Sequence, residues 1–221
     1  MEVSSEKKYK NSGNADVLSL VTGENIRVLD VGCGSGDNAS ILHQKGYKVD
    51  GITISKMELE AATPFLESGY LYNLELGLPA ELKEGVYDYV ICSHVLEHIC
   101  YPEKLITDIR RVLKPGGSLI VALPNIMHYK SRLQLFKGNF NYKDSGLWDY
   151  THFRWYTYKT GKQLLEQYGF QVVLATVTGD IPAKSVLGKI LPEALMKKIY
   201  GVLAGSSKGL FGYQLLYKAN K

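Results

Sequence analysis

Cysteine is scarce in this chain, and so are long apolar runs. The three cysteines, Cys33, Cys92 and Cys100, have no metal-ligand spacing and are odd in number. We therefore expect no disulfide framework, no metal site and a reducing, cytoplasmic environment. No window approaches the roughly 18 continuous apolar residues of a membrane-spanning helix. The first residues also lack the apolar segment of a signal peptide, so neither integral membrane contact nor secretion is expected.

Charge is only mildly unbalanced. The formal net charge is +4 and the isoelectric point is about 8.7. A nucleic-acid binder is expected to carry a concentrated basic face, and this sequence shows none. The charge allows an anionic small-molecule substrate, so we expect a small-molecule partner and no nucleic acid.

The apolar pattern alternates between short strands and helices from residue 26 onward. Strand–helix alternation of this kind predicts an α/β fold with helices on both faces of a doubly wound, mostly parallel seven-stranded sheet. Ser55 and Glu58 have the spacing of a capping box, which predicts a helix start. The predicted strands are 26–31, 47–54, 70–76, 87–93, 118–124, 171–180 and 213–219.

The 221 residues are expected to form a single domain, 1–221, with two additions. Alternation breaks after the fifth strand, where residues 126–158 form a long aromatic and polar segment. Such a segment is often functional, so we predict a substrate-side insertion or lid. Residues 181–206 are predicted to be a short helical appendage. Its basic amphipathic pattern fits a helix that covers a core or a dimer surface better than one that touches a membrane.

A glycine turn comes directly after the first strand. Gly32, Gly34 and Gly36 come after Asp30 as D-x-G-x-G-x-G. Glycine lets a ligand lie against the backbone and allows positive φ. The dinucleotide pattern G-x-G-x-x-G is not met, because Asp37 stands where its third glycine belongs, and an acid there would repel a diphosphate. The turn therefore favours a ligand without phosphates that carries positive charge, and the alternative is a tight turn that only packs a helix on a strand.

The segment "VLDVGCGSG" resembles the first motif of class I S-adenosylmethionine-dependent methyltransferases. The resemblance implies that the turn wraps the methionine part of the cofactor and that Asp30 orients its amino group. The family's acid at the end of the second strand, which holds the ribose hydroxyls, is replaced here by Thr53. Asp50, three residues earlier, is expected to point to the opposite face of the strand. The resemblance also assigns residues on later strands. The cofactor contacts it implies are Asp30, Gly32, Cys33, Gly34, Gly36, Thr53, Ile54, Glu75 near the adenine (with Asn73 as the rival), Ser93 and His94.

The segment "SHVLEHI" is similar to the family's segment directly after the fourth strand. It implies that Ser93 and His94 lie beside the sulfonium and that Glu97 and His98 face the pocket, with packing as the alternative for His98. Asn125 is expected at the tip of the fifth strand.

The segment "DSGLWDYTHFRWYT" resembles a subgroup of bacterial methyltransferases found among genes for surface polysaccharides and glycosyl transfer. A hydroxyl acceptor needs a base, and histidine suits this role, so His152 is the predicted base. Asp149 would fix its tautomer if the turn between them is helical. Arg154 would bind an anion and Trp148 would stack on a ring. The alternative is that these residues hold the insertion on the sheet.

The predicted function is methyl transfer from S-adenosylmethionine to a small acceptor, with an oxygen of a sugar or sugar-linked metabolite as first choice. The predicted catalytic residues are His152, His98 and Asp149, and the predicted substrate contacts are Glu97, Asn125, Arg154 and Trp148. The alternative is a cofactor-binding protein without transferase activity, which the missing second-strand acid favours. Enzymes that methylate nucleic-acid bases carry an N-P-P-Y motif after the fourth strand, and this chain has "SHVLEH" there, so methylation of nucleic acid is not expected. The sequence allows a monomer or a homodimer.

Overall fold

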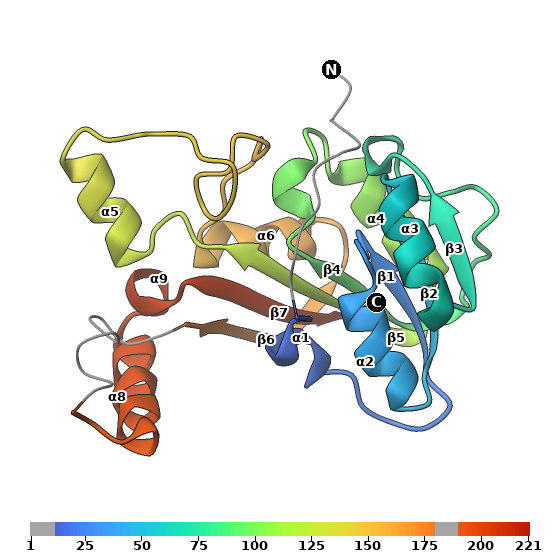
Figure 1. Ribbon diagram of the computed structural model, residues 1–221, viewed down its shortest axis with the longest axis horizontal. Helices are drawn as coiled ribbons and strands as arrows, with labels where there is room; N and C mark the ends of the chain where they lie inside the picture. The colour runs from blue at the N-terminus through green and yellow to red at the C-terminus, as the bar shows by residue number, and fades with distance from the viewer. Residues whose placement is uncertain (1–11, 180–189) are drawn as a thin grey trace.

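The computed structural model describes residues 12–179 and 190–221, and its centre is a seven-stranded sheet of order β3-β2-β1-β4-β5-β7-β6. Parallel pairing joins β3, β2, β1, β4 and β5, and β7 runs antiparallel to β5 and β6 (Figure 1). This confirms the predicted fold class. The strands are β1 Arg27–Val31, β2 Lys48–Thr53, β3 Ser68–Leu71, β4 Tyr87–Ser93, β5 Leu113–Pro124, β6 Gln171–Thr178 and β7 Gln214–Asn220.

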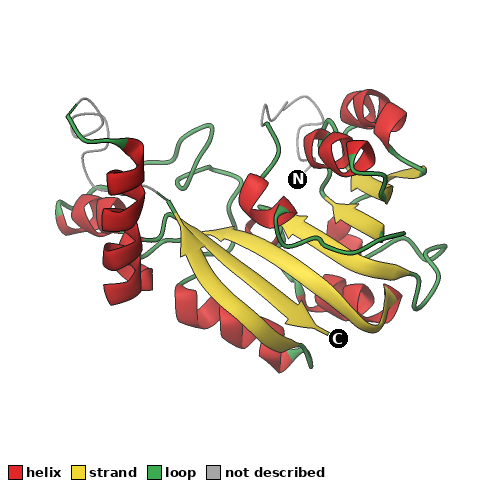
Figure 2. Ribbon diagram, turned by 90° about the horizontal axis from the view of Figure 1, so that it is seen from below, coloured by secondary structure: helices red, strands yellow, loops and turns green. Residues whose placement is uncertain are grey.

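Helices cover both faces of the sheet, as Figures 1 and 2 show. The α1, α2 and α3 helices lie on one face, and α4 and α6 lie on the other. The α-helices are α1 Ala15–Leu18, α2 Asp37–Gln44, α3 Lys56–Ala62, α4 Glu103–Val112, α5 Tyr129–Phe136, α6 Tyr158–Gln167, α8 Glu193–Ser206 and α9 Lys208–Phe211. Short 3-10 turns are η1 Thr63–Phe65, η2 Leu74–Leu76 and η3 Leu96–His98.

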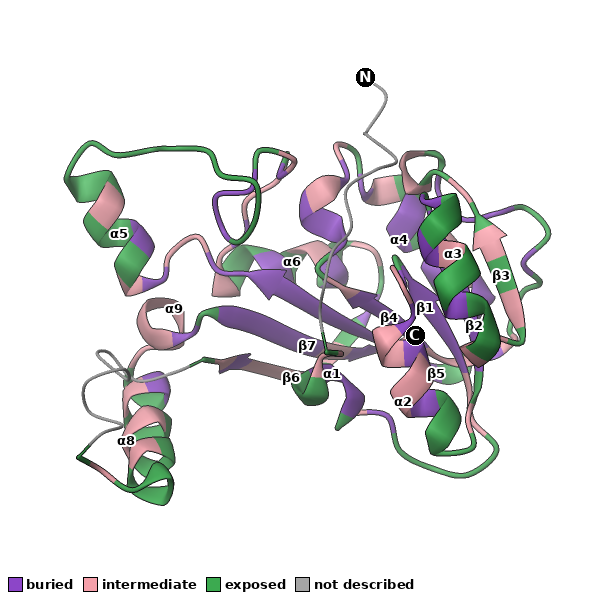
Figure 3. Cartoon of the chain, in the orientation of Figure 1, coloured by how far each residue is buried: buried purple, intermediate pink, exposed green. Residues whose placement is uncertain are grey.

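The central strand β5 shows why the sheet needs two helical layers. Leu119, Val121 and Leu123 point into one buried cluster, whereas Ile120 and Ala122 point into the other. A strand buried on both faces reads as a continuous apolar run, because neither face has to meet water. Figure 3 shows the same strand buried along most of its length.

The parallel register brings four strand ends to one edge. Val31 at the end of β1 pairs with Ile52 of β2 and Cys92 of β4, and Ser93 at the end of β4 pairs with Ala122 of β5. Ligands of open α/β sheets bind outside such carboxyl ends. The residues directly after these strands therefore form the candidate site.

Four predicted segments differ from the structure or lie partly outside it. The predicted fifth strand was too short, because β5 begins at Leu113 and not at residue 118. The predicted third strand was wrong in extent, because β3 ends at Leu71 and the side chain of Asn73 caps η2. The predicted insertion contains α5 and a long loop, and much of it is exposed (Figure 3). In the predicted appendage, residues 181–189 lie outside the described residues, and α8 forms the rest. Across residues 12–179 and 190–221, no helix combines the length and apolarity that a bilayer span requires.

Candidate functional site

The glycine turn adopts the conformations that its sequence predicts. Gly32, Gly34 and Gly36 have φ values of 75°, 54° and 85°. A Cβ on Gly32 would lie 2.5 Å from Val95, and one on Gly36 would lie 2.9 Å from Ala62, so these two glycines serve close packing. A Cβ on Gly34 would meet only Glu58 Oε1, at 4.0 Å. Gly34 is therefore the position where backbone is left open to a ligand.

Asp30 lies beneath this turn as a buried carboxylate. It is 1% exposed, and its Oδ2 has no hydrogen-bond partner among the described residues. Burial raises the pKa of Asp30 to about 7, although a hydrogen bond with Asn38 opposes that shift. An unpaired buried carboxylate is costly unless a cation satisfies it. The site is thus suited to an ammonium group placed over the turn.

Cys33 is buried inside the same turn. Its backbone N–H donates to Ile52 O at 2.9 Å, which ties the turn to β2. Burial first, and the charge of Asp30 second, raise the pKa of its thiol far above the ordinary range, so the side chain stays neutral. Ile54, just past β2, is 43% exposed at the same edge.

Thr53 at the end of β2 is joined to an acid. Its Oγ1 donates to Glu58 Oε2 at 3.0 Å, and Glu58 Oε1 is buried without a hydrogen-bond partner among the described residues. The structure therefore places a carboxylate from α3 beside the end of β2, where the family resemblance expects an acid. Sequence reasoning assigned Glu58 to helix capping, so it missed this residue. The Ser55 side chain does cap the helix, accepting from Glu58 N at 3.4 Å.

Asp50, earlier on β2, is directed away from this edge. Its Oδ2 binds the guanidinium of Arg27 at 2.8 Å and the hydroxyl of Tyr87 at 2.7 Å. This agrees with the expectation that Asp50 and Thr53 face opposite sides of the strand.

Glu75, the predicted adenine neighbour, lies on η2. Its Oε1 accepts the backbone N–H of Cys100 at 2.8 Å, while Asn73 Oδ1 accepts Glu75 N at 3.0 Å. Both side chains thus hold loops together, and contact with adenine stays a prediction.

His94 is strained and doubly hydrogen-bonded. It has φ 58°, which is uncommon for a residue with a Cβ. Its Nδ1 lies 3.2 Å from Glu97 Oε1 and its Nε2 lies 2.8 Å from Gln214 Oε1. Both partners are acceptors, so the ring is placed to hold two protons. Burial lowers the pKa of His94, but Glu97 and Gln214 outweigh it, and the pKa is raised.

Two residues that the sequence patterns did not indicate complete this edge. The Asn14 amide donates to Ser93 Oγ at 3.1 Å and to Gln214 Oε1 at 2.8 Å. Asn14 precedes α1 and Gln214 begins β7, so only the tertiary fold brings them to Ser93 and His94. No local sequence pattern marks either residue.

The run from Asp149 to Arg154 folds back onto η3. The backbone N–H groups of Phe153 and Arg154 donate to Glu97 O at 2.8 and 3.1 Å. Arg154 Nε donates to Cys100 O at 2.8 Å, and its guanidinium lies 6.0 Å from the Tyr101 ring centroid. These contacts agree with the alternative that the run anchors the insertion. Anion binding by Arg154 stays a prediction.

His152 and His98 come together although they are far apart in the sequence. Their ring centroids are 4.6 Å apart at 71°. His152 Nδ1 contacts Leu147 O at 3.0 Å, and His98 Nδ1 contacts Thr151 O at 3.2 Å and Thr151 Oγ1 at 3.0 Å. Burial lowers the pKa of His152, which keeps the ring neutral and able to accept a proton.

The expected pairing of Asp149 with His152 rested on a helical turn, and the turn is not helical. Residues 147–151 form a non-helical turn in which Asp149 Oδ1 accepts from Thr151 N at 2.9 Å and from Thr151 Oγ1 at 2.7 Å. An aspartate that bonds the backbone two residues on favours a turn over a helix. Asp149 therefore acts on Thr151, which in turn contacts His98, and the carbonyl of Leu147 orients His152.

Asn125 and Trp148 are buried among protein atoms. Asn125 donates to Gly209 O at 2.9 Å and Gly212 O at 2.7 Å, and its Oδ1 accepts Met127 N at 3.0 Å. Trp148 packs edge-on against Phe140, with ring centroids 4.8 Å apart, and lies 5.5 Å from Trp155. These contacts support the fold of the insertion, and substrate contact by either residue stays a prediction.

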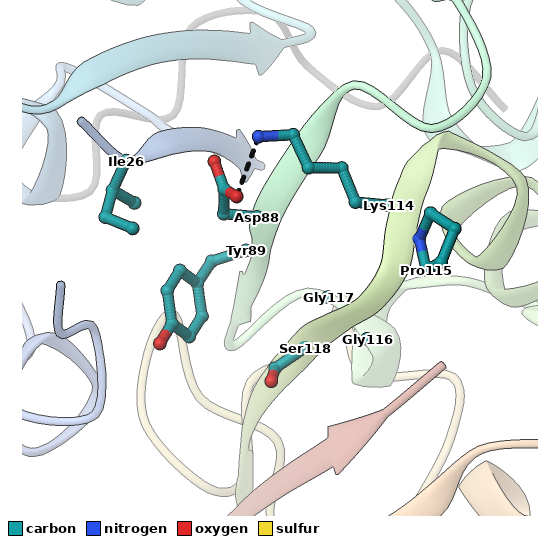
Figure 4. Close-up of a pocket in the computed structure, with 8 residues that line it drawn as sticks. All are labelled: Ile26, Asp88, Tyr89, Lys114, Pro115, Gly116, Gly117 and Ser118. Atoms are coloured by element: carbon teal, nitrogen blue, oxygen red, sulfur yellow. Dashed lines mark hydrogen bonds and ion pairs between the residues drawn. The ribbon is translucent and has the colours of Figure 1, made fainter. Parts of the chain in front are cut away.

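A separate hollow of about 190 Å³ lies at the opposite edge of the sheet. Figure 4 shows it beside the ion pair of Asp88 and Lys114, whose atoms are 2.7 Å apart. Its lining comes from the starts of β4 and β5 and includes the backbone of Gly116 and Gly117. Because it lies at the amino ends of the strands, it is not where the fold places a cofactor.

Residues 5–175 match the family model described as a methyltransferase domain. A ubiquinone biosynthesis O-methyltransferase from Rickettsia canadensis is 35% identical over 104 residues, which cover 46% of this chain and 44% of that protein. This chain thus spans less than half the length of the curated relatives it matches.

Solved structures with the same fold are more distant. A SAM dependent methyltransferase from Archaeoglobus fulgidus aligns with a TM-score of 0.64 and 21% identity, covering 90% of this chain and 87% of that one. The [4+2]-cyclase SpnF aligns with a TM-score of 0.59 and 19% identity, covering 93% and 78%. The fold by itself therefore does not fix the reaction.

Proposed function

Because this chain belongs to the methyltransferase-domain family and has the fold of class I S-adenosylmethionine-dependent methyltransferases, we propose that it transfers a methyl group from that cofactor to an oxygen of a small molecule. The observation that carries the proposal is two buried carboxylate oxygens that have no hydrogen-bond partner among the described residues. They are Asp30 Oδ2, just before the glycine turn, and Glu58 Oε1, 4.0 Å from where a Cβ on Gly34 would be. An ammonium and a pair of ribose hydroxyls would satisfy these two acceptors.

The cofactor, when bound, supplies a methyl group activated by a sulfonium. The chain's own residues bind and orient. Asp30 would hold the amino group, Gly34 would admit the methionine part, and Glu58 would accept from the ribose hydroxyls. At about 4 Å and an effective dielectric of about 20, a carboxylate and an ammonium attract by about 4 kcal/mol. This supports a cationic ligand over a diphosphate at the turn.

The part of the site that would meet the methyl acceptor is formed by Glu97, His98 and His152. They lie beyond His94 at the same edge of the sheet, where η3 meets the insertion. A hydroxyl is a weak nucleophile, so a group that removes its proton is needed near the acceptor oxygen. The lowered pKa of His152 keeps its ring unprotonated, and a carbonyl that accepts from Nδ1–H leaves Nε2 as the nitrogen that can take the proton.

An oxygen acceptor is favoured by the name of the Rickettsia relative, an O-methyltransferase. That name points to a quinone precursor, whereas the sequence pattern of the insertion pointed to a sugar. Exposed aromatic side chains on the insertion, including Tyr150 and Phe153, suit either ring. We therefore propose that the methyl acceptor is a hydroxyl on a ring-shaped small molecule. Quinone precursors and sugars are tested separately.

The test incubates the protein with methyl-labelled cofactor and a panel of nucleotide sugars, quinone precursors and small amines. Mass spectrometry identifies which compound gains a methyl group. Labelling of a hydroxyl compound supports the proposal. Labelling of amines alone overturns the choice of oxygen, and no labelling despite tight cofactor binding overturns the transferase and favours the cofactor-binding alternative.

A further inference from the structure

Three side chains beside the cofactor edge, each predicted separately as a site residue, form a cluster that the sequence patterns did not indicate as a metal site. Glu97, His98 and His152 each offer a ligand atom, and these atoms lie within 4.8 Å of one another. Glu97 is fully buried and His152 is 9% exposed. The spacing rules applied to cysteine could not find the cluster, because His152 comes from a distant loop.

One of the two Glu97 carboxylate oxygens lacks a hydrogen-bond partner among the described residues. Oε1 pairs with His94 at 3.2 Å, but Oε2 is buried with no hydrogen-bond partner among the described residues. A buried carboxylate oxygen without a donor costs free energy unless a cation or a proton satisfies it. One ligand atom of each imidazole lies within 4.8 Å of a Glu97 carboxylate oxygen. The unsatisfied oxygen therefore suggests a ligand that all three side chains share.

Both imidazoles are held through Nδ1. His152 Nδ1 faces Leu147 O at 3.0 Å, and His98 Nδ1 faces Thr151 O at 3.2 Å. When Nδ1–H donates to a carbonyl, Nε2 becomes the basic nitrogen. Metal-binding histidines are oriented in this way by the atoms behind them.

The support behind His98 extends further. The Thr151 hydroxyl donates to Asp149 Oδ1 at 2.7 Å, so its oxygen is available to accept from His98 Nδ1 at 3.0 Å. The result is a carboxylate–hydroxyl–imidazole chain. It gives Asp149 and Thr151 a positioning role that a helical turn at this place would not provide.

We infer that Glu97, His98 and His152 bind a divalent first-row transition metal ion, of which Zn²⁺ is the representative. Two imidazole nitrogens and one carboxylate suit Zn²⁺ and its neighbours, whereas Mg²⁺ and Ca²⁺ prefer all-oxygen sites. Zn–N bonds of roughly 2.0–2.1 Å require the three ligand atoms to move closer by small side-chain rotations. Three protein ligands leave a position open for water or substrate.

The chemical role of the ion rests on the proposed function, although binding of the ion does not. In the open position the ion binds the acceptor hydroxyl and lowers its pKa, so the proton leaves to solvent. The oxygen lone pair then forms the O–C bond as the C–S bond of the cofactor breaks. The products are the methyl ether and S-adenosylhomocysteine. Metal binding thereby takes over the activation otherwise assigned to His152 as a base.

The test uses untagged, chelator-treated full-length protein titrated with Co²⁺, whose visible absorption reports its ligands. We expect one ion per chain, displaced by Zn²⁺, and a rise in melting temperature with Zn²⁺. His152→Ala should weaken binding by well over tenfold. Thr151→Val, which only orients a ligand, should weaken it by about 10-fold or more. His43→Ala, an exposed histidine on α2, is the matched control and should bind as the wild type does.

Failure to saturate with Co²⁺, or equal binding by His152→Ala and His43→Ala, overturns the metal site. Circular dichroism checks that each variant is folded. If His152→Ala does not fold, Thr151→Val still tests the metal site. The two proposals fail separately. A bound ion without any methyl acceptor overturns only the proposed function. Full methylation after chelation, with no ion bound, overturns only the chemical role of the ion.

Discussion

Thr53 donates its hydroxyl hydrogen to Glu58 Oε2 across 3.0 Å, which places a carboxylate from α3 at the end of β2. The other oxygen of Glu58 is buried without a hydrogen-bond partner among the described residues and lies 4.0 Å from where a Cβ on Gly34 would be. A strand that ends in threonine thus gains an acid from the next helix. The absence of an acid on the second strand favoured a protein without activity, and the position of Glu58 weakens that argument.

Glu58→Gln should weaken binding of S-adenosylmethionine by about tenfold or more. A hydrogen bond to a charged group contributes roughly 1.5–3 kcal/mol, and the neutral amide offers ribose hydroxyls a poorer acceptor. Isothermal titration calorimetry measures the change. Glu60→Gln, on the exposed side of the same helix, is the control and should bind as the wild type does. Equal affinities for the two variants would remove Glu58 from the cofactor site.

Gly34→Ala should lower both stability and cofactor affinity. Left-handed backbone costs a residue with a Cβ about 1–2 kcal/mol, and the new methyl group enters the space left for the ligand. Gly85→Ala is a matched control, because Gly85 has φ 62° and open space around its missing Cβ but lies before β4. We expect chemical denaturation to show a similar loss for both variants. Calorimetry should show weakened binding only for Gly34→Ala, and unchanged binding there would place the ligand elsewhere.

Regular periodicity explains which parts of the fold were predictable. β5 is an apolar run between a helix and a break in pattern, so its position follows from sequence, and the glycines of the turn follow from their spacing. The third strand was misplaced because Asn73 caps η2. The apolar residues on both sides of Asn73 looked like one continuous strand. Prediction worked where a regular apolar pattern or a glycine spacing marks the element.

The candidate site was predictable only in part, for the same reason. Ser55 and Glu58 have a spacing that capping explains, so the contact of Glu58 with Thr53 carried no separate signal. The pairs Asn14 with Gln214 and His98 with His152 join distant segments. Their meeting depends on β7 inserting beside β5 and on the loop after α5 folding back over η3. A single sequence contains no record of either event.

Asn125→Ala tests whether this residue binds substrate or holds the chain. Its side chain satisfies Gly209 O, Gly212 O and Met127 N, and each buried group left unpaired costs about 1–3 kcal/mol. We expect the free energy of unfolding to fall by at least about 2 kcal/mol in urea denaturation. Asn139→Ala, at an exposed position of the insertion, should be neutral. A variant of full stability with a raised KM would restore the predicted substrate contact.

Asp30 makes cofactor binding depend on pH. Burial raises its pKa from an ordinary 3.8 to about 7, so the carboxylate that attracts the ammonium is present only above about pH 7. Affinity for S-adenosylmethionine should therefore rise as pH increases from 5.5 to 7.5, by up to about tenfold per pH unit at the acid end. The neighbouring thiols of Cys33 and Cys92 stay neutral throughout, because burial raises their pKa values above the ordinary range. Calorimetry at several pH values, with proton uptake measured in two buffers, follows the titration.

The same group gives stability the opposite trend in the absence of cofactor. Between pH 3.8 and about 7 the folded chain keeps a proton on Asp30 that the unfolded chain releases, so the folded state binds more protons. The free energy of unfolding must then fall as pH rises through this window. Asp30→Asn removes the titration, and we expect it to bind the cofactor weakly at every pH and to lose this part of the pH dependence of stability. If Asp30→Asn keeps the wild-type rise in affinity with pH, the carboxylate under the glycine turn is not the group that meets the ammonium.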